Sequence, residues 1–374
     1  MPVSSRVVFI FLSFSHTFMY DNLDPSAAAY FKNKKILITG AAGTIGAALV
    51  ERILPFEPRV LRLLDNNEEK LFFLNLHYRN RENVRGLLGD VRDRERMARA
   101  MHDVDCVIHT AALKHVGLGE YNPFEVVKTN LLALQGLIEC AIDANVGRFI
   151  FTSSDKAVNP TNVMGGSKFI GERLIASANA YRGNARTVFT STRFGNVIGS
   201  AGSVIPIFRK QLAAGKPLTV TNPGMSRFFM TLAESVDLVL SASTLALGGE
   251  IFVPKMHAMK LMDLAESMSA ILAPGKKIPI HEIGLRSGEK LYEELFSDHE
   301  LPRCLETERM FIVLPYFEET ELAIDGHDFA KLSPSDYPVD SKWASQTYSS
   351  KQVQPLSKSA VLELMKTQLP LLGA

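Results

Sequence analysis

Hydrophobic positions between residues 35 and 201 follow two alternating patterns. Short, nearly continuous apolar runs indicate buried strands, and the longer stretches between them have the spacing of helices. The predicted strands are residues 35–40, 60–65, 84–90, 106–112, 148–154 and 187–194, and the main predicted helices are 44–54, 123–145 and 165–181. Apolar strands that alternate with helices predict a parallel sheet that is covered on both faces.

This pattern is typical of a doubly wound, Rossmann-like α/β domain, which we place at residues 34–195. Beyond it glycine and proline become frequent, and short strands (218–221, 250–254) alternate with helices (232–247, 261–272). We predict a smaller α/β substrate-binding region at residues 196–314, interleaved with the last elements of the sheet. Residues 315–374 are a polar tail that ends in an amphipathic helix at 358–369, which either packs back or meets a partner subunit.

The N-terminal segment is apolar without being long. Residues 7–20 (VVFIFLSFSHTFMY) are too few for a transmembrane helix. His16 interrupts the run and no small-residue cleavage site follows, so it is a weak signal peptide at best. We interpret residues 1–33 as a dispensable extension with Met19 as an alternative start; the other interpretation is a peripheral membrane contact.

Composition narrows the class of protein. The chain has 41 basic and 40 acidic residues, a balance that argues against a general nucleic-acid binder or a polybasic membrane anchor. Cys106, Cys140 and Cys304 lie far apart without metal-ligand spacing, so we predict no metal site. They read as small buried hydrophobic residues of a cytoplasmic protein.

A glycine-rich turn follows the first predicted strand. Gly40, Gly43 and Gly46 have the spacing G-x-x-G-x-x-G and open the next helix. Without Cβ atoms the backbone can approach a pyrophosphate, and the N–H groups of Thr44 and Ile45 at the helix start favour phosphate. The turn predicts a dinucleotide site; the alternative is a turn that needs glycine only for tight packing.

Residues at the next strand ends complete the predicted cofactor site. Asp65 would accept the ribose hydroxyls and repel a 2′-phosphate, which favours NAD over NADP; alternatively it caps the following loop. Asp90 and Val91 would contact the adenine, or form a plain loop. Ala111 and Ala112, at the end of the fourth strand, complete the set.

The most informative stretch is residues 152–168, TSSDKAVNPTNVMGGSK. It resembles extended short-chain dehydrogenase/reductases, in which a Ser or Thr and a Tyr-x-x-x-Lys pair surround the nicotinamide. Ser154 and Lys168 match, but Met164 stands at the tyrosine position. Methionine cannot act as an acid or base, so a standard reductase or 4-epimerase would lack its proton-transfer group.

Asp155 and Lys156 offer a replacement directly after Ser154. A carboxyl and an amine can divide acid and base duties if burial and neighbours push their pKa values toward neutrality. The alternative is a solvated turn with a local ion pair.

These residues, with four further stretches, resemble the CapD-like polysaccharide biosynthesis family, which includes UDP-N-acetylglucosamine 4,6-dehydratases. The further stretches are AALKHVGLGEYNPFE (111–125), TRFGNVIGSAGSVIP (192–206), SRFFMTLAES (226–235) and GLRSGEKLYEELF (284–296). The resemblance spans about residues 34–296, and family members with methionine at the position of Met164 are similar to working dehydratases.

The resemblance implies a mechanism. Hydride passes from C4 of the sugar to NAD and later returns to C6. Lys156 removes the C5 proton and also the 4-hydroxyl proton, while Asp155 protonates the departing 6-hydroxyl. Lys168 holds the nicotinamide ribose, and Ser154 hydrogen-bonds the C4 oxygen.

The substrate site is also assigned largely by resemblance. Lys114 and His115 would line the sugar pocket, although His115 has a purely structural alternative. Asn196 is the candidate for the UDP diphosphate, and Arg227 and Arg286 are the candidate cationic clamps.

Two details of the substrate region stay open. Glu289 and Glu293 would either accept uridine ribose hydroxyls or cap a helix, and we assign only Glu289 to the site. The family commonly reads GSRGS where this chain has GSAGS, so Ala201 lacks an arginine that would contact a phosphate or a subunit.

We therefore expect a UDP-N-acetylglucosamine 4,6-dehydratase with bound NAD that forms a homo-oligomer, without nucleic-acid binding or stable membrane insertion. The rivals are a 4-epimerase of the same fold and a non-catalytic NAD-binding scaffold. Met164 and the Asp155–Lys156 pair weigh against the epimerase, and the intact set of polar residues weighs against the scaffold.

Overall fold

The computed structural model describes residues 25–316, 332–338 and 340–372. The strands are β1 (Lys35–Thr39), β2 (Val60–Asp65), β3 (Val84–Leu88), β4 (Cys106–His109), β5 (Arg148–Ser154), β6 (Val188–Phe194), β7 (Asn196–Val197), β8 (Leu218–Val220), β9 (Ser226–Met230), β10 (Ile251–Pro254), β11 (His257–Lys260), β12 (Ile280–Glu282), β13 (Cys304–Glu306), β14 (Met310–Val313) and β15 (Lys342–Trp343). The α-helices are α1 (Pro25–Phe31), α2 (Thr44–Ile53), α3 (Glu68–His77), α4 (Arg94–Met101), α5 (Val116–Tyr121), α6 (Pro123–Val127), α7 (Ala133–Asp143), α8 (Val163–Tyr181), α9 (Val204–Ala213), α10 (Leu232–Leu245), α11 (Leu261–Leu272) and α12 (Lys358–Gln368).

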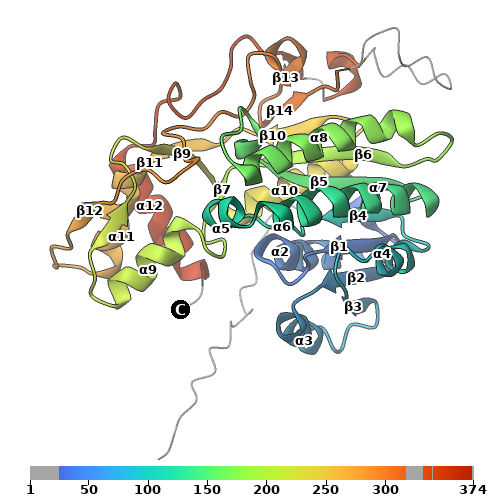
Figure 1. Ribbon diagram of the computed structural model, residues 1–374, viewed down its shortest axis with the longest axis horizontal. Coiled ribbons are helices and arrows are strands. Elements are labelled where there is room, and N and C mark those ends of the chain that lie inside the picture. The colour runs from blue at the N-terminus through green and yellow to red at the C-terminus, as the bar shows by residue number, and fades with distance from the viewer. Residues whose placement is uncertain (1–24, 317–331, 339, 373–374) are drawn as a thin grey trace, which may run out of the picture.

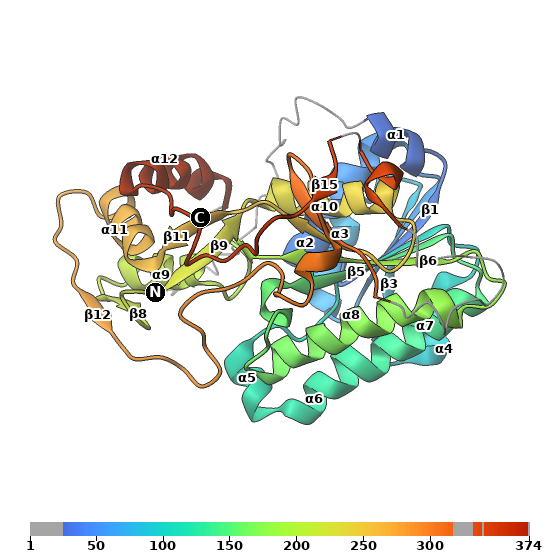
Figure 2. The same ribbon diagram turned by 90° about the horizontal axis from the view of Figure 1, so that it is seen from above.

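A ten-stranded sheet forms the centre of the molecule, in the order β15-β13-β14-β10-β6-β5-β4-β1-β2-β3. The seven strands from β10 to β3 are parallel, and β14, β13 and β15 continue the sheet antiparallel. Figure 2 shows α4, α7 and α8 on one face and α1, α2 and α10 on the other. This confirms the predicted Rossmann-like sheet.

The strand order reverses between β1 and β4, because the chain builds outward to β3 on one side and to β6 on the other. In open parallel sheets such a reversal opens a crevice at the carboxyl ends of the strands, where ligands bind. A ligand site is therefore expected at the segments that follow β1, β4 and β5.

Several helices begin at a side chain that accepts a backbone hydrogen bond. Asn67, Asp93, Asn162 and Thr231 do so at α3, α4, α8 and α10, and Thr231 forms a reciprocal capping box. Gly43, which precedes α2, offers no side chain for this purpose. The first turn of α2 is thus left with backbone donors that no cap satisfies.

A smaller lobe packs beside the sheet (Figure 1). It contains the three-stranded sheet β11-β9-β7, the pair β12-β8, and α9, α11 and α12. Val361 and Met365 of α12 are fully buried in its core with Met268 of α11. The final helix therefore packs back on the chain, and β10 and β13–β15 return to the main sheet, so the lobe is interleaved as predicted.

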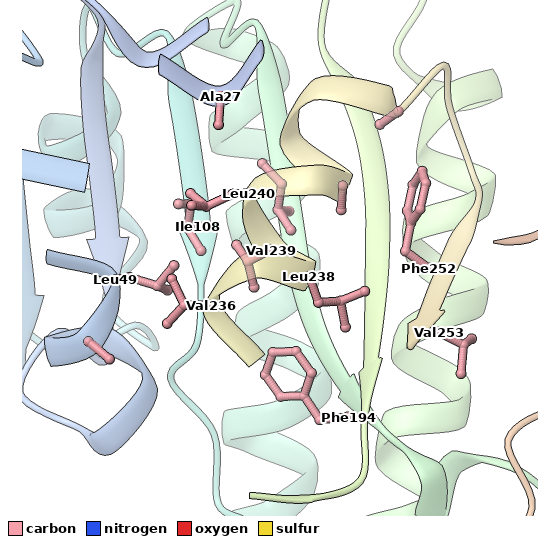
Figure 3. Packing of buried hydrophobic residues seen from close by; sticks show 14 of the residues in the cluster. Ala27, Leu49, Ile108, Phe194, Val236, Leu238, Val239, Leu240, Phe252 and Val253 are labelled. Carbon is pink, nitrogen blue, oxygen red and sulfur yellow. The ribbon is translucent and has the colours of Figure 1, made fainter. Parts of the chain in front are cut away.

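The N-terminal boundary at residue 33 needs correction. Ala27 and Phe31 of α1 are fully buried, and the Phe31 ring stacks on Phe56 with 6.1 Å between centroids. Figure 3 shows Ala27 in the same cluster as Leu240 of α10. Residues 25–31 thus belong to the fold because they cover α10, whereas the apolar run and Met19 lie outside the described residues.

No helix within residues 25–316, 332–338 and 340–372 is both long and apolar enough to cross a membrane.

Candidate functional site

The glycine turn after β1 is sterically required. Gly40 has φ +68°, and a Cβ there would lie 2.8 Å from the backbone N of Ala111. A Cβ on Gly46 would overlap the carbonyl oxygen of Gly40. Gly43 has more room, and it starts α2 without a side-chain cap. Tight packing therefore requires glycine at Gly40 and Gly46. The uncapped backbone N–H groups of Thr44 and Ile45 are where a phosphate would fit.

Asp65 at the end of β2 makes two different contacts. Its Oδ2 accepts a hydrogen bond from the N–H of Ala42 in the glycine turn (2.9 Å), and its Oδ1 accepts one from Asn67 N (2.9 Å). The loop-capping alternative thus describes one oxygen, while the other ties the carboxylate to the glycine turn. A ribose contact by Asp65 stays a prediction.

Asp90 is engaged by a neighbouring cation. The Arg92 guanidinium donates to it at 3.0 and 2.7 Å and holds the pKa of this carboxyl low, at about 2. Val91 is largely buried in the core beside α4. If Asp90 bound the adenine amine, that amine would compete with the Arg92 guanidinium for the same carboxylate oxygens. The sequence did not indicate this ion pair.

The segment after β5 brings three predicted residues together. Ser154 Oγ and Lys156 Nζ both donate to Asp155 Oδ1, at 3.0 and 2.9 Å. Asp155 is fully buried, and its Oδ2 has no hydrogen-bond donor within the described part of the chain. The alternative of a solvated turn is therefore wrong, although the ion pair that it included is present.

Lys156 is held as an ammonium group. Burial by itself lowers its pKa, but the charges of Asp155 and Glu293 outweigh burial and raise it. Its Nζ also donates to Asn196 Oδ1 at 3.3 Å. The expectation that its neighbours push the amine toward neutrality is wrong for the free protein, because both nearby carboxylates favour the charged form.

Lys168 and Met164 lie on the first two turns of α8. Lys168 is buried with its Nζ 2.7 Å from the carbonyl oxygen of Thr152 and 4.6 Å from the centre of the Phe151 ring; burial lowers its pKa to about 8. Met164 is buried as well. At Gly165 a Cβ would overlap the carbonyl oxygen of Lys156, so glycine lets α8 approach the turn.

Asn130 is a residue that the sequence analysis missed. It is buried in the π-helical turn Lys128–Leu132, where it bonds both the N–H and the C=O of Leu113 (2.9 Å each) and donates to Ser167 Oγ (2.9 Å). It thereby fixes the loop that carries Lys114 and His115 against α8. Periodicity cannot reveal it, because a π turn interrupts the helical repeat.

The loop GSAGS after β7 touches both predicted halves of the site. The N–H of Ala201 donates to Thr44 Oγ1 in the cofactor turn (3.3 Å), and a Cβ on Gly202 would overlap the His115 ring. Ala111 lies against Gly40, with Ala112 partly exposed beside it. Lys114 is exposed, and its contact with the sugar stays a prediction.

The predicted cationic clamps differ in their surroundings. Arg227 is buried, donates to the carbonyl oxygens of Ser226 (2.8 Å) and Lys290 (2.6 Å), and lies 4.0 Å from Glu289. Arg286 is exposed, and its N–H donates to Glu289 Oε2 at 3.2 Å. Arg227 is thus already satisfied by protein groups, and Glu289 caps its own turn.

Glu293 rather than Glu289 joins the reaction centre. It is 2% exposed, and its Oε1 lies 4.0 Å from Lys156 Nζ and 3.8 Å from Arg227 Nε. Lys290 is 3.1 Å from its other oxygen. The sequence did not indicate this contact of Glu293, because only the depth of the two glutamates in the fold distinguishes them; the assignment of Glu289 to the substrate site stays a prediction. Asn196, expected at the diphosphate, also faces Lys156.

Cys106, Cys140 and Cys304 are buried free thiols, as expected from the sequence. Within the described ranges no three His, Cys, Asp or Glu side chains gather in a way that would hold a metal ion.

Comparison with known proteins identifies relatives over most of the chain. The family model described as polysaccharide biosynthesis protein matches residues 36–315. The chain is 46% identical over 342 residues to the uncharacterized membrane protein MJ1061 of Methanocaldococcus jannaschii, covering 90% of this chain and 96% of that one. It is 41% identical over 287 residues to a UDP-N-acetylglucosamine 4,6-dehydratase (inverting) of Campylobacter jejuni, covering 76% and 84%.

Two further comparisons bear on fold and reaction. A UDP-glucose 4-epimerase of Rickettsia felis is 39% identical over 278 residues, covering 73% of this chain and 81% of its own. Among solved structures, Pen from Bacillus thuringiensis superimposes with a TM-score of 0.81 at 40% identity, covering 90% of this chain and 98% of that one.

Proposed function

This chain belongs to the polysaccharide biosynthesis protein family, and from that premise we propose that it is a UDP-N-acetylglucosamine 4,6-dehydratase. The product would be a UDP-2-acetamido-2,6-dideoxy-4-keto-hexose for a surface polysaccharide or a protein-linked glycan. The observation that carries the proposal is the Asp155–Lys156 ion pair, with its carboxylate fully buried, next to a buried methionine that replaces the usual phenol. The similarity to the Campylobacter dehydratase supports it.

The cofactor in this proposal is a nicotinamide dinucleotide, with NAD preferred to NADP. The glycine turn would hold its pyrophosphate at the uncapped start of α2, and the Asp65 carboxylate beside Ala42 would receive the adenosine ribose and disfavour a 2′-phosphate. Lys168 would hold the nicotinamide ribose. When bound, the cofactor supplies the acceptor and later the donor of hydride.

The resting ion pair already contains the proton that the reaction needs. Moving one proton from the Lys156 ammonium to Asp155 across the 2.9 Å hydrogen bond produces an amine and a carboxylic acid without adding or removing atoms. Substrate binding favours this neutral form, because excluding water from the site makes separated charges more costly. The pair thus becomes the base and the acid that an elimination requires.

The elimination then runs through these two side chains. Lys156 takes the C5 proton while Asp155 protonates the 6-hydroxyl, which leaves as water, so the pair ends as ammonium and carboxylate. Lys156 returns a proton to C5 when hydride reaches C6. The proton that Lys156 took earlier from the 4-hydroxyl passes through water and finally restores Asp155. Ser154 Oγ would hydrogen-bond the C4 oxygen.

The second candidate is a 4-epimerase, which the similarity to the Rickettsia enzyme favours. Met164 weighs against it because a thioether cannot exchange a proton with the 4-hydroxyl.

One experiment separates the candidates. The purified protein is incubated with UDP-N-acetylglucosamine in D₂O and the products are followed by proton NMR. A C6 methyl group with deuterium at C5 supports dehydration, whereas UDP-N-acetylgalactosamine supports epimerisation. Binding of NAD and the UDP-sugar without turnover would contradict both and favour a scaffold.

A further inference from the structure

Glu293 is a buried carboxylate that approaches the reaction centre from a distant part of the chain. It lies in the segment 284–296, more than 130 residues beyond the turn that carries Lys156. Its Oε1 lies between two cations, 4.0 Å from Lys156 Nζ and 3.8 Å from Arg227 Nε, while its Oε2 is 3.1 Å from Lys290 Nζ. The carboxylate of Glu293 therefore faces three cations, one of which is the amine of the reaction centre.

The backbone around Glu293 is fixed from both sides. Its N–H donates to Ser350 Oγ (3.0 Å), and the N–H of Ser350 donates to its carbonyl oxygen (2.8 Å). Ser350 in turn accepts a hydrogen bond from Ser226 Oγ on β9 (2.9 Å). Two residues farther on, the buried Arg193 guanidinium donates to the carbonyl oxygen of Leu295 at 2.7 Å. The carboxylate is thus placed by contacts with the main sheet, the small lobe and the tail.

Lys156 needs such a partner more than Glu293 does. A lysine side chain is flexible, with four rotatable bonds. Asp155 lies next to Lys156 in sequence, so their ion pair holds the amine from one segment of the chain only. Asn196 and Glu293 supply contacts from two other segments. We propose that Glu293 is a positioning residue that anchors the Lys156 amine from the segment 284–296. The inference rests on the proposed function, in which that amine is the base.

The geometry has a consequence for pH dependence. The charged groups that face the Lys156 amine are Asp155, Glu293 and Arg227; the two carboxylates raise the pKa of Lys156 and Arg227 lowers it. Removing the charge of Glu293 lets the amine lose its proton at lower pH. Because the reaction starts from the Asp155–Lys156 pair with one proton between them, turnover falls at high pH as this proton is lost to solvent, and the alkaline limb must move to lower pH in Glu293→Gln.

The first test is the pH profile of kcat. For Glu293→Gln we expect the alkaline limb to move down by about one pH unit and the plateau to fall about tenfold because the amine is less well held. Glu293→Asp keeps the charge at a greater distance, so its limb should move less in the same direction. Glu294→Gln is the matched control, since its carboxylate binds Asn159 at 2.8 Å, and its limb should stay in place.

The second test does not depend on turnover. The full-length protein with bound cofactor is labelled with trace acetic anhydride at a series of pH values, and modification of Lys156 is quantified by mass spectrometry against an exposed lysine. A lower titration midpoint in Glu293→Gln, with Glu293→Asp between it and wild type, supports the anchor. If that shift occurs in a protein that makes no 4-keto product, the proposed function fails and the positioning role stands.

Superimposable titrations of wild type, Glu293→Asp and Glu293→Gln would overturn the inference and leave Glu293 a partner of Arg227 and Lys290 only. Should Glu293→Gln fail to fold, the comparison of Glu293→Asp with wild type decides, since an unmoved Lys156 midpoint there overturns the inference equally.

Discussion

The two halves of the site are built from different materials. The cofactor half is backbone: glycines whose missing Cβ atoms permit a tight turn, and a helix start without a side-chain cap. The reaction half is a network of charged and polar side chains that come from the turn after β5, from β7 and β9, from the segment 284–296 and, through Ser350, from the tail. Steric requirements determine which residues can form the cofactor half, and the need to compensate charges determines which residues can form the reaction half.

This difference teaches where each half is vulnerable. A backbone cradle tolerates changes of charge but not of volume, because close packing leaves no room for an added methyl group. A buried charge network tolerates small changes of volume, but the loss of one partner leaves another buried charge uncompensated. The two halves should therefore respond to opposite kinds of substitution.

The variant with the largest expected effect should lose turnover and keep cofactor binding. In Lys156→Ala turnover should fall about 10⁴-fold, the upper end for one acid–base group, because the same amine serves the 4-hydroxyl and C5. The cofactor should stay bound, since Lys156 makes no contact with the glycine turn in the described structure. Product formation by NMR and cofactor content by absorbance after acid release check both parts. Asp155→Asn should behave alike, and near wild-type turnover in either variant would remove that residue from the scheme.

The next effect concerns a separate buried ion cluster, which links β6 to α8 and to Glu300. Arg193 of β6 is 1% exposed and pairs with Glu172 of α8 (2.7 Å) and with Glu300 (3.0 Å). In Arg193→Met both carboxylates lose their partner in the interior, and the free energy of unfolding should fall by about 3–5 kcal/mol.

Urea unfolding followed by circular dichroism measures this loss. The matched control is Arg99→Met, whose pair with Glu95 is about three-quarters exposed on both sides and should change stability by less than about 0.5 kcal/mol. Equal losses in the two variants would mean that burial of the Arg193 cluster does not matter.

Acid should weaken the same cluster without mutation. Burial alone would raise the pKa of Glu300, but the charge of Arg193 outweighs it and lowers the pKa to about 2. The ordinary value is 4.5, so this stabilisation is complete above about pH 4.5 and is lost as pH falls toward 2, by about 3 kcal/mol. Urea midpoints between pH 6 and 2 measure the slope, which should be shallower in Glu300→Gln. An unchanged slope in that variant would assign acid sensitivity to other carboxylates.

The smallest effect tests the cofactor half by adding one methyl group. In Gly46→Ala the new Cβ would overlap the carbonyl oxygen of Gly40, so α2 must shift away from the turn. We expect a loss of about 1–3 kcal/mol in stability and weaker binding of the dinucleotide, measured by calorimetry. Gly136→Ala in α7 meets nothing within 4 Å and should stabilise the protein by up to about 1 kcal/mol. Equal NAD affinity in Gly46→Ala and wild type would show that the turn tolerates volume after all.

The same contrast explains which sequence predictions succeeded. The parallel strands β1–β6, the main helices that cover them and the presence of α12 were predictable, because periodicity and apolar runs are local properties. Whether α12 packs back on the chain or meets a partner subunit was left open by the sequence. The cluster of Ser154, Asp155, Lys156 and Lys168 was also predictable, since these residues lie within one strand–turn–helix segment.

Other parts of the site were not predictable. The choice between Glu289 and Glu293, the partnership of Asn196 with Lys156 and the charged state of that lysine all depend on burial and on contacts between distant segments. The inclusion of α1 in the core depends on α10, which lies about 200 residues later in the chain.

The sequence by itself determined the sheet, the glycine turn and the kinds of side chain at the reaction centre, because these follow from steric rules and repeats that act over a few residues. Only the tertiary structure decided which carboxylates surround Lys156, how deeply they are buried and what holds them there. The physical reason is that the interaction between charges depends on their distance and on the surrounding water, and the folded chain sets both.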